Sequence, residues 1–337
     1  MATMDDIAKA LGVAKSTVSK AINGAGDVSE SMRRAVLETA VELGYTRLRR
    51  SEDTPRLAVF VADMRYERPE HFGYDVIVGF RKLAEPEGYH VEIIPVTSAM
   101  QSDIRYDEYM MRGNYRGGFL LGFSLKDPWM REFESCKTPT VLYDNRVTGN
   151  PLVTYVGADT TEGMSLAVRY LKRLGHRKIG YLSGDLGSYV YQLRYQAFFD
   201  ALRAESLPAW DSLAGCAYQE QICVDEHLPR LLRHGCTAIV CSHDTLAEAV
   251  IDRCREKGIS IPEQISVLGF DDLPLCETTE PPLTTIRQNR TELGKSAYCA
   301  LDSQMEGVPL STFLLHTELV KRQSCAAVPE QDAEQGR

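Results

Sequence analysis

Residues 3–24 read TMDDIAKALGVAKSTVSKAING and hold two short helical patterns on either side of Gly12. Thr3 begins the first pattern, because a threonine followed three residues later by an acid is a typical helix N-cap. Gly12 ends it, since glycine readily adopts the left-handed conformation that follows a helix. The second pattern runs from Lys15 to Asn23. Two short helices joined by a tight turn predict a helix-turn-helix unit.

The second helix is expected to have two chemically different faces. Its apolar stripe consists of Val18, Ala21 and Ile22. The opposite face carries only basic and hydroxyl side chains, namely Lys15, Ser16, Ser19 and Lys20. An ordinary small three-helix bundle would expose more glutamate. The pattern therefore favours contact with the DNA major groove, where the second helix of such a unit lies.

Residues 28–45, VSESMRRAVLETAVELGY, predict a third helix that Ser29 caps and Gly44 ends. Its apolar side chains lie mainly on one side and are Val36, Ala40, Val41 and Leu43. Ala14 stands at the N-cap of the second helix, where a serine would stabilise that helix by about 1 kcal/mol.

Composition limits what the chain can be. Its 337 residues are 44% hydrophobic and carry a net charge of −9, although residues 1–50 carry +2. No apolar run approaches the roughly 18 residues of a membrane span. The first ten residues do not resemble a signal peptide, so we expect a cytoplasmic protein. Nine cysteines without a C-x-x-C pair predict reduced thiols, and the Cys and His residues between 216 and 236 match no zinc spacing, so no metal is expected.

Beyond residue 56, apolar runs alternate with helical patterns. The predicted strands are Leu57–Ala62, Val91–Val96, Phe119–Phe123, Thr140–Tyr143, Ile179–Leu182, Thr237–Cys241 and Ile265–Phe270. The predicted helices are Tyr74–Glu87, Glu162–Leu174, Ser188–Glu205 and Asp244–Lys257, and Gly88, Gly175 and Gly258 end three of them. This alternation indicates parallel sheets covered on both faces. About 270 such residues suit two doubly wound α/β lobes better than one.

Polar residues follow several of these strands, at the sheet edge where ligands of doubly wound folds bind. They are Asp144, Asp159, His243-Asp244 and Asp271-Asp272, and Arg194 lies early in the Ser188–Glu205 helix. For Asp159 and Asp244 we favour a simpler role as helix N-caps. Arg194 by itself is most readily interpreted as a surface arginine. Only the common position of these residues at one edge of the sheet indicates a site.

Enzymatic signatures are missing from the sequence. There is no G-x-S-x-G nucleophile motif and no G-x-x-x-x-G-K-[ST] phosphate loop. Gly184-Asp185-Leu186-Gly187 follows a strand but lacks the lysine of a phosphate loop. We therefore predict a protein that is not an enzyme and needs no cofactor.

Residues 3–24 and 28–45 together resemble the DNA-binding head of the LacI/GalR (lac-repressor) family of transcription regulators. The resemblance continues through VGADTTEGMSLAVRYLKRLGHRKIGYLSG at 156–184, R-x-x-A-F at 194–198, VLGFDD at 267–272, PPLTTIRQ at 281–288 and LVKRQS at 319–324. It implies a homodimer that binds a pseudo-palindromic double-stranded DNA operator. It also implies a small effector, such as a sugar or sugar phosphate, held between two periplasmic-binding-protein-like lobes.

The resemblance assigns candidate roles by position. Base-reading positions are Lys15, Ser16 and Lys20, and lysine can donate to guanine. Other DNA-binding candidates are Thr3, Thr17, Ser19, Asn23 and Ser29. Effector-binding candidates are Phe72, Asp144, Arg194, Tyr218, His243 and Asp271. Carboxylates and a guanidinium together suit a polyol. His243 replaces the family's usual asparagine, and Arg290 replaces a position that is often aromatic.

The resemblance divides the chain into a head at 1–46, a hinge at 47–56, an effector-binding and dimerisation domain at 57–326 and a flexible tail at 327–337. Within the third part, lobe 1 is expected at about 57–158 and 290–317, and lobe 2 at about 159–287 and 318–326. Only eleven residues separate Tyr45 from Leu57, and none of them is a leucine at the position that the family wedges into the minor groove. We therefore expect no operator kink.

Two hypotheses follow. The first is an effector-gated repressor of a carbohydrate-utilisation operon, with a nucleoside or other non-sugar effector as the alternative that His243 suggests. The second is an effector-binding sensor whose head has weak or no specific affinity for DNA, which the shortened hinge suggests.

Overall fold

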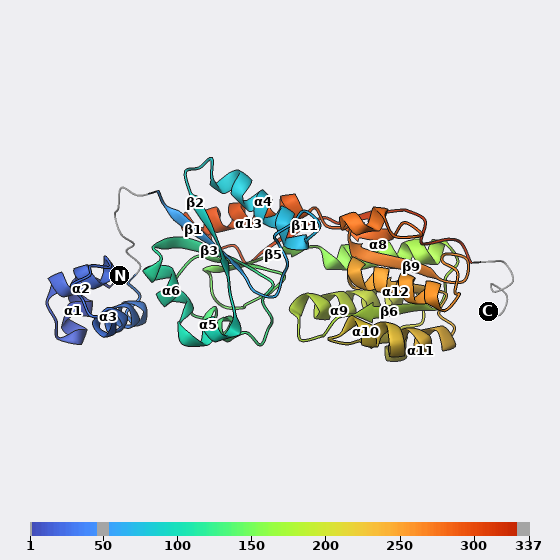
Figure 1. Ribbon diagram of the computed structural model, residues 1–337, viewed down its shortest axis with the longest axis horizontal. Helices are drawn as coiled ribbons and strands as arrows, with labels where there is room; N and C mark the ends of the chain where they lie inside the picture. Colours follow the sequence, from blue (N-terminus) through green and yellow to red (C-terminus); the bar gives the residue numbers. More distant parts are fainter. Residues whose placement is uncertain (1, 46–53, 329–337) are drawn as a thin grey trace. The chain divides into compact units, whose positions relative to one another are not determined.

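The computed structural model describes residues 2–45 and 54–328, so most of the predicted hinge and tail lie outside the described residues. The chain divides into two compact units (Figure 1). Unit 1 contains residues 1–64, 76–156 and 294–313, and unit 2 contains residues 65–75, 157–293 and 314–337. Within the described residues, no helix is both long enough and apolar enough to cross a lipid bilayer.

Unit 1 begins with the three predicted helices of the head: α1 (Met4–Leu11), α2 (Lys15–Ile22) and α3 (Glu30–Glu42). Gly12 ends α1 in the left-handed conformation, with φ of 65°. The expected stripes meet in one small core that includes Ile7, Val18, Val36 and Ala40. The prediction that Leu43 lies on the same apolar side of α3 as Val36 and Ala40 is wrong. This residue is exposed because it is the C-cap of α3 and lies past the last turn that faces the core.

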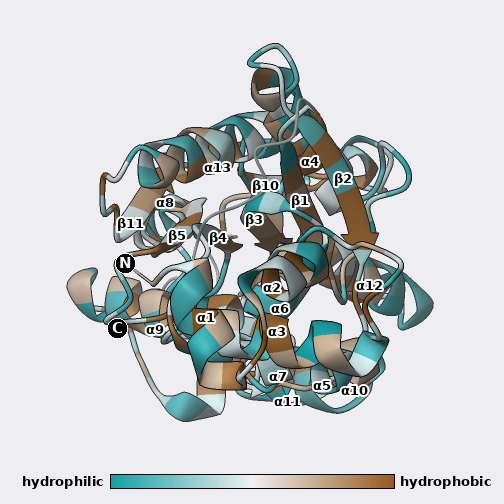
Figure 2. Ribbon diagram, turned by 90° about the vertical axis from the view of Figure 1, so that its left-hand side faces the viewer, coloured by the Kyte–Doolittle hydropathy of each residue, from teal (hydrophilic) through white to brown (hydrophobic). Residues whose placement is uncertain are grey.

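The rest of unit 1 is built on a six-stranded sheet of order β11-β5-β4-β3-β1-β2. Its strands are β1 (Arg56–Val61), β2 (His90–Pro95), β3 (Tyr115–Leu121), β4 (Thr140–Tyr143), β5 (Val153–Ala158) and β11 (Thr312–Leu315). Its helices are α4 (Phe72–Ala84), α5 (Ser98–Asp103), α6 (Tyr106–Arg112), α7 (Pro128–Glu132) and α13 (Arg290–Met305), of which α4 and α13 begin in unit 2. Figure 2 colours β1 as predominantly hydrophobic, as expected of a buried parallel strand.

Unit 2 repeats this plan with the sheet β12-β10-β9-β8-β6-β7. Its strands are β6 (Ile179–Ser183), β7 (Ala214–Cys216), β8 (Ala238–Cys241), β9 (Ser266–Asp271), β10 (Thr284–Arg287) and β12 (Glu318–Val320). Its α-helices are α8 (Thr160–Arg173), α9 (Tyr189–Ala204), α10 (Glu220–Ile222), α11 (Leu228–Arg233) and α12 (Asp244–Glu256), with short turns η1 (Asp211–Leu213), η2 (Cys223–His227) and η3 (Pro274–Glu277). The last described strand, β12, pairs antiparallel with β10.

The predicted doubly wound α/β class is confirmed, because both sheets consist mainly of parallel strands connected by helices. Gly88, Gly175 and Gly258 have positive φ of 86°, 93° and 68°, a conformation that suits glycine after a helix. Each of them lies just before a strand or the loop that leads to one. Because the paired strands run parallel, their carboxyl ends lie at one edge of each sheet. This is the edge where the sequence predicts the polar residues.

Candidate functional site

The polar face of α2 is available at the surface of the head. Lys15, Ser16 and Lys20 are exposed, and Thr17, Ser19 and Asn23 are partly exposed. The Lys15 ammonium pairs with Asp5 Oδ2 at 2.6 Å, and Lys20 pairs with Asp27. Asp27 has a lowered pKa because Lys20 donates a hydrogen bond to it. Exposed ion pairs of this kind are weak, so DNA phosphates can compete for both lysines.

Thr3 and Ser29 serve as helix caps. Thr3 Oγ1 accepts from the Asp6 N–H at 3.3 Å, and the Thr3 N–H donates to Asp6 Oδ2 at 2.8 Å, forming the reciprocal capping box that the sequence predicts. Ser29 Oγ accepts from the Met32 N–H at 3.3 Å. Ala14 caps α2 with no side-chain hydrogen bond. Thr3 and Ser29, two of the predicted DNA-binding residues, thus fix the N-terminal turns of α1 and α3.

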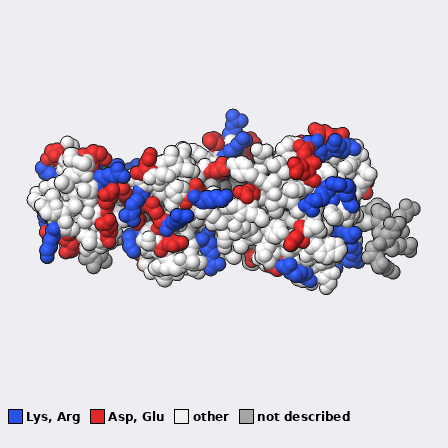
Figure 3. Space-filling view, turned by 90° about the horizontal axis from the view of Figure 1, so that it is seen from below, with Lys and Arg blue, Asp and Glu red and all other residues white. Residues whose placement is uncertain are grey.

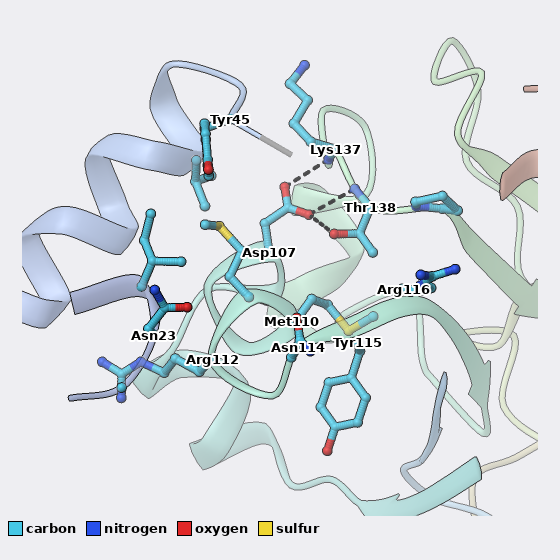
Figure 4. A pocket seen from close by; sticks show the side chains of 15 residues that line it. Asn23, Tyr45, Asp107, Met110, Arg112, Asn114, Tyr115, Arg116, Lys137 and Thr138 are labelled. Atoms are coloured by element: carbon cyan, nitrogen blue, oxygen red, sulfur yellow. Dashed lines mark hydrogen bonds between the residues drawn. The ribbon is translucent and has the colours of Figure 1, made fainter. Parts of the chain in front are cut away.

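Where the head meets the rest of unit 1, a cavity of about 190 Å³ lies between α6 and the ends of α2 and α3 (Figure 4). Asn23 and Tyr45 line it from the head. On the other side, the Asp107 carboxylate accepts from the backbone N–H groups of Lys137 and Thr138 at 2.9 and 3.1 Å. The hydrogen bonds of Asp107 hold the cavity wall in place.

Unit 2 brings Arg194 and Asp271 together. Arg194 is only 4% exposed, and its Nη2 donates to Asp271 Oδ1 at 3.2 Å. Gln288 Nε2 donates to the same oxygen at 2.6 Å, and Arg194 Nη1 donates to the Ser242 carbonyl. The guanidinium also lies over the Phe270 ring, 4.0 Å from its centroid. The interpretation of Arg194 as a surface arginine is therefore wrong, because this face of α9 packs onto β9.

The simpler role proposed for Asp159 holds, and the one for Asp244 does not. Asp159 Oδ1 accepts from the Glu162 N–H at 3.0 Å and caps α8. The position before α12 is instead held by His243, and Asp244 turns away from its own helix. Its Oδ2 accepts from the Leu273 N–H at 2.8 Å and its Oδ1 accepts from Thr285 at 2.6 Å. The Asp244 carboxylate thus fixes the turn that follows Asp271.

Asp244 also has an unusual ionisation. Burial is the largest cause, and the negative charge of Asp271 is the second. Together they raise the pKa of Asp244 to about 7. The Asp244 carboxyl therefore takes up a proton far more readily than an ordinary aspartic acid.

His243 lies at the same edge of the sheet and is bonded at both ring nitrogens. Nδ1 is 2.8 Å from Ser242 Oγ, and Nε2 is 2.7 Å from Glu220 Oε1. The Tyr191 ring stacks on the imidazole with 5.5 Å between ring centroids. The contact with Glu220 lowers the pKa of that residue, because His243 donates a hydrogen bond to the carboxylate. Tyr191 and His243 thus form a stacked aromatic surface, and the Glu220 carboxylate holds the His243 ring in place.

The other predicted effector residues are distributed differently. Phe72 is the first residue of α4, is partly exposed and belongs to unit 2. Asp144 directly follows β4 in unit 1 and has a positive φ of 54°, which sets it at a sharp turn. Tyr218 is 80% exposed in the loop between β7 and α10. Within unit 2, the structure thus joins Arg194 and Asp271 directly and leaves Tyr218 on the surface.

Comparison with known proteins identifies the family. The model described as bacterial regulatory proteins, lacI family, matches residues 3–47, and the one described as a periplasmic binding protein-like domain matches residues 168–325. The chain belongs to the LacI family. This LacI-family chain is therefore a DNA-binding transcriptional regulator, and the family consists of regulators rather than enzymes.

Relatives align with this LacI-family chain along nearly its whole length. It is 28% identical over 343 residues to the transcriptional regulator MalR of Streptomyces coelicolor, covering 98% of each chain. It is 28% identical over 339 residues to the transcriptional repressor CytR of Escherichia coli, covering 97% of each. The structure of the transcriptional regulator CelR in complex with cellobiose matches with a TM-score of 0.70 and 25% identity, covering 96% of this chain and 100% of that one.

Sequence reasoning missed three residues of the unit 2 network. Gln288, Ser242 and Glu220 bond to Asp271, Arg194 and His243 respectively. Gln288 ends the PPLTTIRQ segment and Ser242 precedes His243, so the position of both after a strand was a usable signal. Glu220 lies in a three-residue helix that has no periodic pattern of its own.

Proposed function

We propose that this LacI-family regulator is a homodimeric repressor of a carbohydrate-utilisation operon and that a sugar-type effector controls its affinity for a pseudo-palindromic operator. The observation that supports this most directly is the buried network of Arg194, Asp271 and Gln288 at the carboxyl ends of β9 and β10. It presents carboxylate, amide and guanidinium groups in fixed positions. Such groups recognise hydroxyls.

The DNA contacts proposed for α2 follow from its exposed polar face. Lys15, Ser16 and Lys20 would read base edges, and Thr17, Ser19 and Asn23 would contact phosphates or adjacent bases. Thr3 and Ser29 would contribute through the helix ends that they cap. Acidic and basic side chains both occur across the face drawn in Figure 3, so the proposed affinity comes from the head and not from a basic coat over the whole chain.

Effector control requires a difference in affinity. A ligand shifts the equilibrium between a DNA-binding and a non-binding state only by as much as it prefers one of them. Phe72, Asp144 and His243 are the further side chains proposed to contact it. Similarity to CelR supports a sugar, since the CelR structure is a complex with cellobiose. The stacked pair of Tyr191 and His243 favours a second candidate, a nucleoside, because a planar base would stack on it.

The proposal is tested by operator binding with and without effectors. The purified protein should bind a selected duplex at about 150 mM salt, where non-specific phosphate binding is suppressed. One neutral sugar or nucleoside should change that affinity. Binding of a sugar without any specific duplex binding would favour the sensor hypothesis.

A further inference from the structure

The head contacts the rest of unit 1 through the last turn of α6. Met111 packs against the apolar core of the head, whose other members are residues of the head itself. Arg112 Nη1 lies 3.3 Å from Oε1 of Glu30, the first residue of α3. The contact therefore has an apolar part and a charged part, and it joins two segments that the predicted hinge separates in the sequence.

This contact is weak and incompletely packed. The Arg112 side chain is 33% exposed and that of Glu30 is 67% exposed. Exposed ion pairs of this kind contribute little to stability. The cavity of about 190 Å³ beside α6 shows that the head and the sheet domain of unit 1 do not fill the space between them. The head can therefore leave α6 without disrupting a close-packed core.

Bonds within unit 1 hold the α6 side of the contact in place. The Tyr106 hydroxyl lies 2.9 Å from Thr140 Oγ1 at the start of β4. Arg112 Nη2 donates to Oε1 of Glu108 at 2.8 Å, and the Glu108 side chain is only 2% exposed. Because these bonds do not involve the head, α6 keeps its position whether or not the head is bound. Docking therefore immobilises few additional side chains, which keeps its entropic cost small.

The connection between the head and β1 is short. Eleven residues separate Tyr45, at the end of the head, from Leu57 in β1. A short linker gives two tethered partners an effective concentration on the order of millimolar. A contact that is too weak to form between separate molecules can therefore be populated within one chain. The weakness of the α6 contact thus does not prevent it from holding the head for part of the time.

Docking covers part of the head that is proposed to contact DNA. Asn23, the C-cap of α2, lines the cavity from the head, and Arg112 lines it from α6 (Figure 4). Ser29, the N-cap of α3, directly precedes Glu30. Arg112 therefore lies beside the helix N-terminus at which a phosphate would bind. The last turn of α6 thus stands where DNA would have to approach Asn23 and Ser29.

We infer that the last turn of α6 is a docking surface for the head of the same chain, and that docking competes with binding of the operator. This inference rests on the proposed function, because only a head that binds DNA can be inhibited in this way. The docked head leaves Lys15 and Lys20 exposed but withholds Asn23 and Ser29 from DNA. The operator affinity of the whole protein is then the affinity of the free head multiplied by the fraction of heads that are free.

Variants at the contact test the competition. Glu30→Gln removes its charged part, and Met111→Gln weakens its apolar part from outside the head. Each should bind the selected operator about threefold more tightly or better in fluorescence anisotropy at about 150 mM salt, because more heads are free. Glu38→Gln is the matched control for charge, since Glu38 is also exposed on α3 but pairs with Arg34 of the same helix. It should gain clearly less affinity than Glu30→Gln.

Hydrogen exchange of the full-length protein measures docking without DNA. Glu30→Gln should speed exchange of the backbone N–H groups of residues 111–116, because the head no longer covers them, whereas Glu38→Gln should leave that exchange unchanged. Both substitutions are at exposed positions, so neither disturbs a packed core. Adding the operator to the unaltered protein should also speed exchange at residues 111–116, because the head leaves α6 to bind DNA.

Two results would overturn the inference. The first is an operator affinity that neither Glu30→Gln nor Met111→Gln raises above that of Glu38→Gln. The second is exchange at residues 111–116 that the operator leaves unchanged or slows. Specific operator binding together with either result would refute the competition and leave the proposed function intact. If no duplex binds the unaltered protein or any variant, the proposed function fails as well, and the exchange of Glu30→Gln alone shows whether the head docks.

Discussion

The guanidinium of Arg194 donates to the carboxylate of Asp271 at 3.2 Å, although 77 residues separate them in the sequence. Both side chains are almost fully buried in unit 2. Breaking a buried pair by removing one partner typically costs about 3–5 kcal/mol, because the remaining charge loses its compensation. This pair therefore links the stability of unit 2 to the proposed binding of the effector.

Replacing Asp271 should separate effector response from DNA binding. Asp271→Asn keeps an acceptor oxygen and removes the charge, so we expect the free energy of unfolding to fall by up to about 3 kcal/mol. The effector response should be lost while operator affinity stays unchanged. Asp252→Asn, at an exposed pair on α12, is the control. An unchanged response in Asp271→Asn would remove this residue from the site.

The raised pKa of Asp244 predicts a pH dependence of stability. The folded protein holds the Asp244 proton up to about pH 7, whereas the unfolded chain releases it near pH 4. Stability from this group is therefore full below about pH 4 and is lost as pH rises to 7, by about 1.4 kcal/mol per pH unit. Asp244→Asn should lack that loss. In urea unfolding, the free energy of unfolding of this variant should therefore rise relative to that of the unaltered protein between pH 5 and pH 7. Parallel pH profiles would contradict this assignment.

The uncapped start of α2 offers a stabilising substitution. Ala14 has extended backbone angles of φ −70° and ψ 145° and makes no side-chain cap. Ala14→Ser should stabilise the head by about 1 kcal/mol, because the hydroxyl can accept from an N–H of the first turn. Ala10→Ser places the same hydroxyl at an exposed position within α1 and should give no gain in stability. Thermal unfolding of the full chain distinguishes them, and equal shifts would argue against capping.

Lys15 should contribute to sequence recognition and not only to electrostatic attraction. Lys15→Ala is expected to weaken binding to the selected operator by about 1–3 kcal/mol and to affect a scrambled duplex less. Lys9→Ala removes an exposed lysine from α1 as a control for charge. Fluorescence anisotropy at about 150 mM salt provides the comparison. An equal loss on both duplexes would restrict Lys15 to phosphate contact.

Much of the fold was predictable because local signals determine it. Continuous apolar runs predict β4 and β8 almost to the residue, and the capping box of Thr3 predicts the start of α1. These features depend on neighbours within a few positions. The short helices α10 and α11 were missed, because each has too few residues to show a helical period.

The site was less predictable because its contacts join distant segments. The role of Asp244 depends on a backbone N–H 29 residues away. The hydrogen bond that Arg290 Nη2 donates to Asp75 Oδ2 at 2.7 Å depends on how closely α13 approaches α4. A Cβ on Gly294 would lie 1.9 Å from the Val76 carbonyl oxygen, so glycine is required there. Such packing is invisible to a periodic pattern in one segment.

The most direct test of the proposed regulator is selection of genomic fragments by the purified protein at about 150 mM salt, with and without neutral sugars and nucleosides. We predict enrichment of one pseudo-palindromic site, with half-sites about one helical turn apart or a multiple of it, and a change in its recovery when an effector is added. Recovery of no common sequence under any of these conditions would contradict the account and favour a sensor whose head has lost specificity for DNA.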